Sequence, residues 1–371
     1  MTYKETLFFI GKSLTINKEI KNKIWVEAQI KDNLVDWDAV VKVSTGHFVF
    51  PALYCNLKKA NFLCHVPADL VAYMEHITDL NRERNQKIIN QAKEIRELLM
   101  ANKITPIFLK GTGNLLEGLY EDIAERMVGD IDFIVSKQEY HKTIQIIENY
   151  GYKKKSVDNY PEFKHYPKLH KTDGKSIAAL EIHKELLTEK YAKEFNYDRI
   201  RGGIQILNKN YVLSYSNQLN LSIIAKQIND RGTYYKNISL RNSYDIFLLS
   251  FKTNALKSIV SFDKLFNPLN NYLAITYEIM GEISSLEYKK NINCQNYLKD
   301  FNKNLNHKRF RKKNIQLAQT KISIEKKLEI IKNILYNSEY RSWLIVMAKD
   351  KKWVQKQLLK LGFKKSKSYR I

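Results

Sequence analysis

The chain has 371 residues, of which 44% are hydrophobic and 12% aromatic, enough for one large domain or two to three modest ones. This composition excludes a disordered chain, and 13 glycines with 6 prolines exclude collagen-like and linker-type architectures. Three widely spaced cysteines, with no C-x-x-C pair, exclude a disulfide framework and a cysteine-rich zinc site. No apolar run approaches the roughly 20 residues of a membrane span, so we expect a soluble cytoplasmic protein with no membrane partner.

Positive charge is concentrated toward the C-terminal end of the chain. The net charge is +23, and residues 289–371 hold 23 Lys and Arg against 5 Asp and Glu. A region this basic could bind nucleic acid or another polyanion. However, Lys outnumbers Arg 50 to 12, whereas bidentate recognition of phosphates and bases favours Arg. We therefore favour a lysine-rich solvated surface and keep nucleic-acid binding as the alternative.

Hydrophobic periodicity divides the chain into helical and mixed regions. Residues 1–103 are predicted to form a helical N-terminal region, with one apolar stripe at helical spacing over 76–100. Residues 104–190 are predicted to form an α/β core, residues 191–260 a helical segment that completes the same domain, and residues 261–371 a basic helical region. The expected fold class is α+β, with a small mixed sheet and its flanking helices set between helical N- and C-terminal regions.

Within the mixed region, strand and helix patterns alternate. Strands are expected at short apolar runs, and helices where apolar residues recur every three to four positions. The predicted elements are a strand over 105–109, a helix over 114–126, a strand over 130–135, a helix over 141–150, and strands over 162–169 and 177–183. Beyond residue 217 only helices are predicted, the first two over 219–229 and 240–252.

The strand over 130–135 carries two aspartates at alternate positions. Asp130 and Asp132 therefore project from the same face, about 7 Å apart along the strand, while Ile131 and Phe133 face the other way. Two such carboxylates repel each other, and a divalent cation between them would relieve the repulsion. Hard oxygen ligands suit Mg²⁺, which accepts water and substrate phosphates at its other positions. A solvated strand edge is the alternative for the pair taken alone.

A third carboxylate lies on a later strand. In the segment 178–183, Glu181 and His183 share the face opposite the apolar side chains. If this strand lies beside the one that carries Asp130 and Asp132, the three acids could hold two metal ions roughly 3.5–4 Å apart. For His183 a hydrogen-bonded strand histidine is the favoured interpretation, and it is assigned no catalytic role.

A glycine-containing turn precedes these acids. The segment from Leu109 through Lys110, Gly111 and Thr112 leads from a strand into a helix. Glycines let a ligand approach the backbone closely, and a helix N-terminus offers free N–H groups to phosphates. The segment matches neither a Walker A loop nor a G-x-G-x-x-G fingerprint. Lys110 could neutralise phosphate or extend from the strand end into solvent, and the sequence leaves both open.

Together these motifs resemble the DNA polymerase beta-like nucleotidyltransferase superfamily, in which a turn with glycine, a helix, a strand with alternating aspartates and a later acidic strand follow in this order. The closer resemblance is to a bacterial group described as uncharacterised nucleotidyltransferases. It covers about residues 30–250 and is carried by the segments FLKGTGNLLEGLY, R-x-x-GDIDFIV, NYGY, ALEIHKELL and SLRNSYDIFLL.

This resemblance implies a polymerase beta-like core and a Mg²⁺- or Mn²⁺-dependent transfer of a nucleoside monophosphate from a nucleoside triphosphate (NTP) to an acceptor, with release of pyrophosphate. By motif, Asp130 and Asp132 would bind the metal ions, and Glu181 would complete the acceptor-side metal site and could act as base. Gly111 and Thr112 would hold the triphosphate. The superfamily's commoner turn is Gly-Gly or Gly-Ser, so the Gly-Thr pair of this chain is a departure.

The acceptor stays open at this point. A hydroxyl of a small molecule is favoured, and the alternatives are RNA held by residues 289–371, a protein hydroxyl as in toxin–antitoxin nucleotidyltransferases, or a chain that binds nucleotide without catalysis. Lys226 and Arg231 could reach the triphosphate, although a solvated helix face is their favoured role. Asp245 is predicted to be structural and paired with Arg241, four residues earlier on the same helix.

Overall fold

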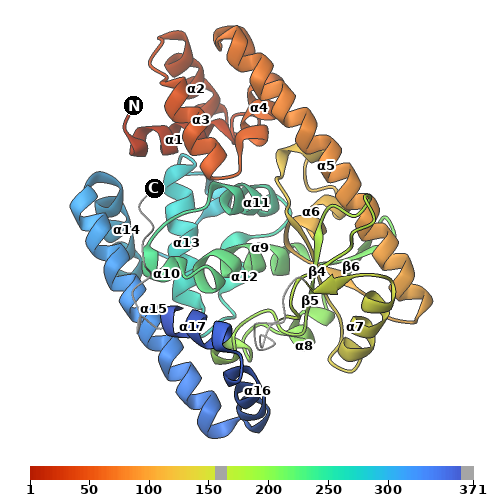
Figure 1. Ribbon diagram of the computed structural model, residues 1–371. Helices are drawn as coiled ribbons and strands as arrows, with labels where there is room; N and C mark the ends of the chain where they lie inside the picture. The colour runs from red at the N-terminus through yellow and green to blue at the C-terminus, as the bar shows by residue number, and fades with distance from the viewer. Residues whose placement is uncertain (155–164, 361–371) are drawn as a thin grey trace. The chain divides into compact units, whose positions relative to one another are not determined.

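A computed structural model describes residues 1–154 and 165–360 of the chain (Figure 1). These residues fall into two units, one that ends at Asn306 and one that begins at His307. The first unit therefore extends past residue 261, where the sequence analysis begins its last region. None of the described helices combines the length and the apolarity that crossing a membrane requires.

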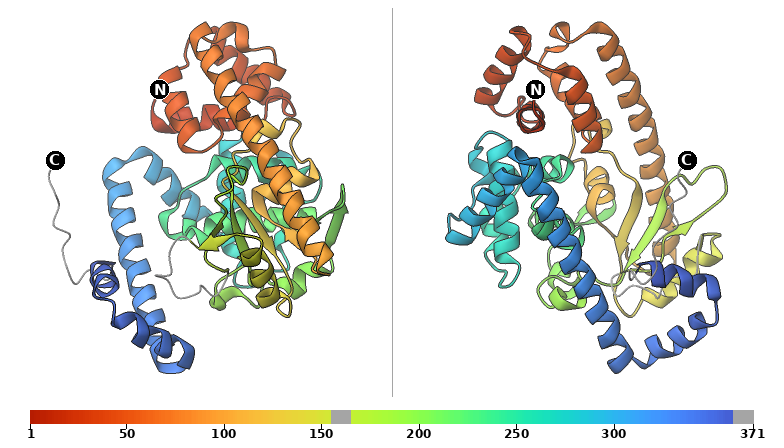
Figure 2. Two further views of the ribbon diagram at one scale, coloured as in Figure 1. Left: turned by 45° about the vertical axis from the view of Figure 1, so that its right-hand side comes forward. Right: turned by 60° about the vertical axis from the view of Figure 1, so that its left-hand side comes forward.

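Helices form the whole N-terminal part of the first unit. They are α1 (Tyr3–Ser13), α2 (Ile20–Lys31), α3 (Trp37–Gly46), α4 (Phe50–Lys59), the short η1 (Leu63–His65) and the long α5 (Ala68–Ala101). Figures 1 and 2 show α5 running along the sheet. The apolar stripe predicted here is right over its second half, where Ile88, Ala92, Ile95 and Leu99 are buried. It is wrong over its first half, because Leu80 is 49% exposed and the inward positions there are Thr78, Asn81 and Asn85. Asn81 and Asn85 donate hydrogen bonds to the Ala124 and Arg126 carbonyls, both at 2.7 Å, and so hold the segment that leads into the site.

A seven-stranded mixed sheet follows, in the order β3-β4-β5-β2-β1-β7-β6. Two neighbouring pairs, β2 with β5 and β1 with β7, are parallel, and the other pairs are antiparallel. The predicted α+β fold, a mixed sheet between helical regions, is confirmed. The strands are β1 (Ile107–Phe108), β2 (Asp130–Ile134), β3 (Lys153–Lys154), β4 (Leu169–His170), β5 (Ala179–His183), β6 (Ile204–Leu207) and β7 (Asn210–Leu213).

Two strand predictions differ from the structure. Of the strand predicted over 162–169, residues 162–164 lie outside the described residues, and the rest contributes only a bridge from His165 to His183 and the short β4. The hairpin β6–β7 was missed altogether. Its turn residues, Asn208 and Lys209, have φ of +50° and +66°, as a two-residue hairpin loop of type I′ requires. The Asn-Lys pair lacks the glycine that usually signals such a loop.

Helices surround the sheet in the rest of the first unit. The helix predicted over 114–126 begins earlier, at Lys110, and ends at Glu117, because Gly118 takes a left-handed conformation with φ +79° that closes it. The remaining elements of the unit are η2 (Ile123–Glu125), α7 (Tyr140–Asn149), η3 (Glu189–Tyr191), α8 (Tyr197–Arg201), α9 (Tyr215–Ile224), the π-helical turn η4 (Ala225–Asn229), α10 (Gly232–Tyr235), α11 (Leu240–Ser250), α12 (Ala255–Ile259), α13 (Phe266–Ile279), η5 (Ser284–Leu286) and α14 (Ile292–Asn306); the shortened helix is α6 (Lys110–Glu117).

The second unit consists of α15 (Lys308–Tyr336), α16 (Ser338–Ala348) and α17 (Lys351–Lys360). Among its described hydrophobic side chains, only Ala318 and Trp353 are buried. Basic residues run consecutively in α15, at 311–313 and again at 326–327, and successive helix positions differ by about 100°. The positive charges of α15 therefore surround the helix instead of gathering on one face.

Candidate active site

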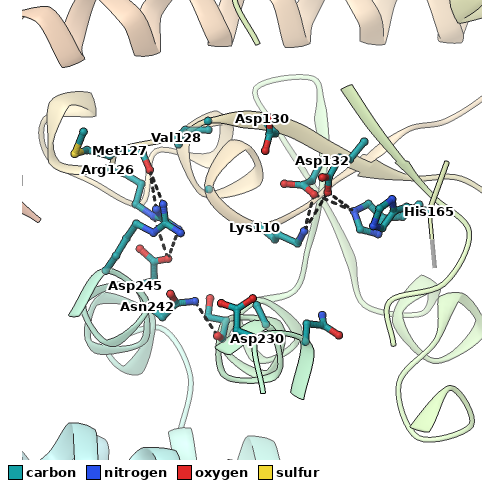
Figure 3. A pocket seen from close by; sticks show the side chains of 18 residues that line it. Lys110, Arg126, Met127, Val128, Asp130, Asp132, His165, Asp230, Asn242 and Asp245 are labelled. Atoms are coloured by element: carbon teal, nitrogen blue, oxygen red, sulfur yellow. Dashed lines mark hydrogen bonds and ion pairs between the residues drawn. The ribbon is translucent and has the colours of Figure 1, made fainter. Parts of the chain in front are cut away.

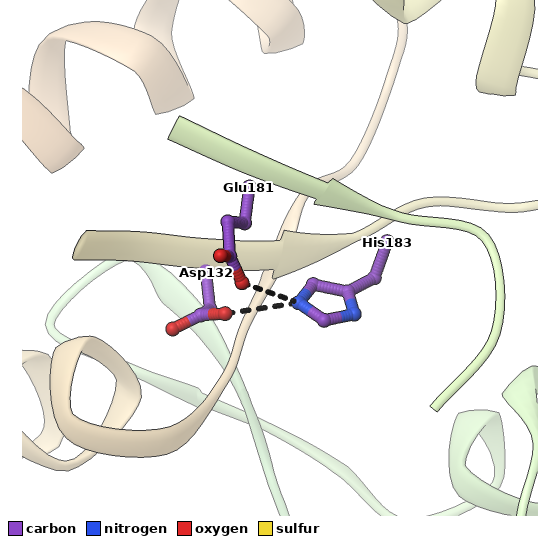
Figure 4. Close-up of side chains that lie close together, drawn as sticks. All are labelled: Asp132, Glu181 and His183. Carbon is purple, nitrogen blue, oxygen red and sulfur yellow. Dashed lines mark hydrogen bonds and ion pairs between the residues drawn. The ribbon is translucent and has the colours of Figure 1, made fainter. Parts of the chain in front are cut away.

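The acidic residues predicted from the two strands meet on one face of the sheet. Strand β5 lies parallel beside β2, and the register places Glu181 directly opposite Asp132. Asp130, two residues before Asp132, and His183, two residues after Glu181, extend the same face. Figure 4 shows the side chains of Asp132, Glu181 and His183 converging, and a ligand atom from each lies within 4.8 Å of the others. This spacing could hold a metal ion.

His183 is hydrogen-bonded within this group. Its Nε2 lies 2.9 Å from Oδ1 of Asp132 and 3.6 Å from Oε2 of Glu181. The ring is 4% exposed, and Nδ1 is buried without a hydrogen-bond partner among the described residues. An Nε2–H that donates to Asp132 fits these contacts and agrees with the predicted hydrogen-bonded strand histidine. With the proton on Nδ1 instead, Nε2 could bind a metal ion, so His183 is also a candidate ligand, a role that the sequence analysis did not assign.

Two lysines bridge the three carboxylates. Nζ of Lys110 lies 2.6 Å from Oδ1 of Asp132 and 3.7 Å from Oε2 of Glu181. Nζ of Lys168 lies 2.6 Å from Oδ2 of Asp130 and 2.9 Å from Oε1 of Glu181. Each lysine therefore offsets the repulsion between acids on neighbouring strands. Lys168 was missed in the sequence, because it precedes the short β4 and carries no motif.

These contacts shift the ionisation of the site. Burial alone would raise the pKa of Glu181, but its contact with the His183 imidazole, the positive charge of Lys110 and the hydrogen bond from Lys168 hold it well below its usual range. Burial would likewise lower the pKa of Lys110, yet the charges of Asp132 and Glu181 raise it. At neutral pH the site thus holds an ionised glutamate and a protonated lysine.

The turn that begins α6 supports this arrangement. Lys110 has φ +53°, a conformation that costs a residue with a side chain about 1 kcal/mol or more, and such strain is often found at functional sites. Gly111 lines the cleft, and a Cβ there would lie 2.9 Å from the Val128 side chain, so glycine lets α6 approach the segment before β2. Thr112 is 1% exposed, and its hydroxyl donates to the Asp130 carbonyl at 2.9 Å. Thr112 therefore fixes the start of β2 from beneath the cleft.

A cleft of about 380 Å³ separates the strand wall, defined by β2 and β5, from a second wall (Figure 3). This volume lies within the range of small-molecule sites. The second wall, which we call the arginine wall, comprises Arg126, Met127, Ser222, Asn229, Asp230, Arg241, Asn242 and Asp245.

A buried ion pair lies in the arginine wall. Nε and Nη2 of Arg126 lie 3.1 and 2.9 Å from Oδ2 of Asp245, and the Tyr120 hydroxyl donates to Oδ1 at 2.7 Å. Asp245 is 1% exposed, as its predicted structural role requires. The partner predicted for it is wrong: Asp245 pairs with Arg126, and Arg241 donates to the Met127 carbonyl instead. Asp245 and Arg241 are four residues apart on one helix, but Arg126 is the residue that reaches the carboxylate. Arg126 is held in place because Asn81 and Asn85 of α5 bind the carbonyls of its segment.

The part of the chain that contains the turn, the strand with two aspartates and the later acidic strand matches a known protein family. Residues 33–271 match the sequence profile of a family described as uncharacterised nucleotidyltransferase. The chain belongs to this family. The resemblance inferred from the motifs is thereby confirmed, and with it the expectation of an enzyme that transfers nucleotidyl groups. Searches among curated proteins and among solved structures give no match.

All residues of both walls lie inside the segment that the nucleotidyltransferase family covers. The strand wall was found from its alternating acids. The arginine wall was not recognised as part of the site, because its residues come from a loop, a π-helical turn and a helix that are far apart in the chain. Arg126 was named only within the motif R-x-x-GDIDFIV, and Arg241 and Asp245 only as a structural pair. The only local signal was the run of polar residues inside the apolar helix α11.

Proposed function

We propose that this nucleotidyltransferase transfers a nucleoside monophosphate from an NTP to a hydroxyl of a small molecule, with Mg²⁺ or Mn²⁺ held by Asp130, Asp132 and Glu181. The observation that carries the proposal is the parallel pairing of β2 with β5, which sets Asp132 beside Glu181 within ligand distance. The donor set of carboxylate oxygens suits these hard cations, and the imidazole of His183 would add preference for Mn²⁺ over Mg²⁺. A cation bound there would neutralise phosphate charge and polarise the phosphorus that is attacked.

The reaction is an in-line displacement. The acceptor oxygen attacks the α-phosphorus, a new P–O bond forms, and the bond to the bridging oxygen of the β-phosphate breaks, so that pyrophosphate leaves with the electron pair. Glu181, ionised at neutral pH, is the nearest group to accept the hydroxyl proton, although its depressed pKa makes it a weak base. Its main role in this proposal is therefore to hold charge and position at the acceptor side.

Lys110 and the first turn of α6 would bind the triphosphate. A protonated ammonium at Lys110, 2.6 Å from Asp132, can turn toward a phosphate oxygen once the carboxylates are otherwise neutralised. The N–H groups of the first turn, at Gly111 and Thr112, have no partners inside the helix and suit an anion. A contact between phosphate and the Thr112 hydroxyl would require that hydroxyl to leave the Asp130 carbonyl.

The proposal is tested by incubating the full chain with each labelled NTP and with Mg²⁺ or Mn²⁺, in the presence of a metabolite pool, an RNA pool or protein alone. We expect pyrophosphate release with the metabolite pool, which chelation by EDTA abolishes. A labelled RNA or a labelled protein band would assign the acceptor to another class. No release in any pool with either metal would contradict nucleotidyl transfer by this site.

A further inference from the structure

Two buried polar atoms of the arginine wall have no hydrogen-bond partner among the described residues. They are Nε of Arg241, a donor, and Oδ1 of Asn229, an acceptor. The one hydrogen bond of the Arg241 guanidinium within the described chain runs from Nη1 to the Met127 carbonyl at 3.4 Å. Both atoms are closed to solvent in this structure, although the side chains that carry them line the cleft. Buried polar groups are normally satisfied, so a small turn of these side chains toward a ligand in the cleft would supply the missing partners.

The charge of the arginine wall indicates which part of a nucleotide it would receive. Arg126 is neutralised by Asp245. Burial and the charge of Arg126 lower the pKa of Arg241, and the negative charges of Asp245 and Asp230 act against that shift. Two guanidinium groups and two carboxylates leave the wall without net charge. A triphosphate calls for an excess of positive charge, whereas a neutral group with donors and acceptors matches this balance.

The free edge of Arg241 narrows the ligand further. Since Nη1 bonds Met127, the side that carries Nε and Nη2 remains as a planar fork with two parallel donors. Such a fork pairs with two adjacent acceptors, for example O6 and N7 of guanine. The N–H groups on another edge of the base would need acceptors, which a carboxylate or an amide oxygen can supply. Asp230 and Asn229 supply those acceptors on the same wall.

The backbone that carries these acceptors has an unusual form. Helix α9 widens into the π-helical turn η4 over Ala225–Asn229, a feature that recurs at functional sites. Arg231 follows with φ +58°, and at Gly232 a Cβ would lie 2.6 Å from the Lys226 carbonyl. The chain thus needs a glycine at 232 to fold back behind η4, and this fold presents Asn229 and Asp230 to the cleft.

We propose that the arginine wall binds the nucleobase of the NTP and selects guanine, with Arg241 donating to O6 and N7 and with Asn229 and Asp230 accepting from N1–H and N2–H. The inference rests on the proposed function, because it assumes that the triphosphate lies on the strand wall. It adds to that function a base preference and the three residues that determine it.

The test compares ligands with and without a base. Affinities of GTP, ATP, CTP, UTP and inorganic tripolyphosphate are measured by calorimetry with Mn²⁺, for the wild-type chain and for Arg241→Ala, Arg241→Lys and Asp230→Asn. Arg201→Ala, on the exposed helix α8 outside the cleft, is the matched control. We expect GTP to bind tightest to the wild type. Each variant of Arg241 should lose roughly tenfold to hundredfold in GTP affinity and nothing in tripolyphosphate affinity.

Arg241→Lys keeps the charge but loses the planar fork, so it separates base recognition from simple attraction. Full GTP affinity in this variant, or an equal loss of GTP and tripolyphosphate affinity in Arg241→Ala, would overturn the inference in favour of a phosphate site. A wild type that binds all four NTPs equally would overturn the inference alone. A wild type that binds neither NTP nor tripolyphosphate would overturn the proposed function with it. Melting curves confirm that each variant is folded.

Discussion

The two walls of the cleft arise from different kinds of sequence pattern. The strand wall comes from two short segments in which every second residue is acidic or histidine, and parallel pairing of β2 with β5 brings them together. The arginine wall draws Arg126 from a loop, Asn229 from a π-helical turn and Arg241 from a helix. Site residues that share one strand can therefore be predicted from their spacing in the sequence. Site residues that come from separate loops and helices are identified only in the tertiary structure. The predictions below separate the roles of the two walls.

The largest effect is expected from Asp132→Asn on the strand wall. Asp132 contacts Lys110 and His183 and lies opposite Glu181, so the substitution removes the charge of a proposed metal ligand and weakens the contacts of both neighbours. Turnover should fall more than about a hundredfold, as is typical when charge stabilisation at the reacting group is removed. Pyrophosphate release measures it. Asp198→Asn, on the exposed part of α8, is the control, and full activity of Asp132→Asn would contradict the metal site.

Glu181→Gln should separate catalysis from nucleotide binding. Because Glu181 is placed on the acceptor side, kcat should fall at least about tenfold while NTP affinity changes little. Steady-state kinetics and calorimetry with the same NTP provide the two numbers. The surface variant Glu97→Gln is the control. A loss of NTP affinity equal to the loss of kcat would move Glu181 to the triphosphate side.

Much of the fold could be predicted because the strong patterns are local. Strand β2, helix α7 and helix α11 match their predicted ranges closely, since each has a clear apolar period and a defined end. The errors come from competing local effects. Gly118 ends α6 early by taking a left-handed conformation, and β6–β7 escaped prediction because its turn contains Asn208 and Lys209 instead of glycine.

The site could be predicted only where residues share one strand face. Asp130, Asp132 and Glu181 were found in this way, and the structure brings them to one face of the sheet. Lys168 could not be found, and Arg126 was named only within a motif without a role, because a lysine or arginine in a loop is ordinarily a solvated residue. Their contacts with acids depend on how α5 and β5 position those loops.

On the arginine wall, Asp245→Ala should mainly reduce stability. The variant leaves the Arg126 guanidinium buried without its carboxylate and removes the acceptor of the Tyr120 hydroxyl. Breaking a buried ion pair in this way costs about 3–5 kcal/mol. Urea denaturation measures the free energy of unfolding, with Asp198→Asn again as the exposed control. An unchanged midpoint would mean that Arg126 finds another acceptor or water.

A smaller effect, dependent on pH, is expected from Glu117 at the end of α6. Burial raises its pKa from 4.5 to about 7, against the hydrogen bond from Gln218 and the charge of Lys252. Between pH 4.5 and about 7, Glu117 is protonated in the folded state but ionised in the unfolded state. The free energy of unfolding therefore falls as the pH rises toward 7.

Glu117→Gln should therefore stabilise the protein at pH 8, by about 2 kcal/mol, and leave it little changed at pH 4. The variant amide can also donate to Oε1 of Gln218, which is buried without a partner in the described structure. Melting temperatures at both pH values measure the difference. The exposed variant Glu97→Gln should change neither, and equal stabilisation of Glu117→Gln at both pH values would contradict the pKa shift.

The smallest effect on activity is expected from removing the second unit by ending the chain after Asn306. Its positive charges surround α15 and show no single binding face, and the strand and arginine walls lie entirely in the first unit. Pyrophosphate release should therefore persist.

Ending the chain before Ile292 removes α14 as well, with its buried Tyr297 and Phe301, and should lower the melting temperature. A different result would assign the second unit to binding a polyanion: the full chain binds RNA at physiological salt, and the version ending at Asn306 does not. Such binding should weaken steeply as salt rises, since each neutralised phosphate steepens the dependence of binding on salt.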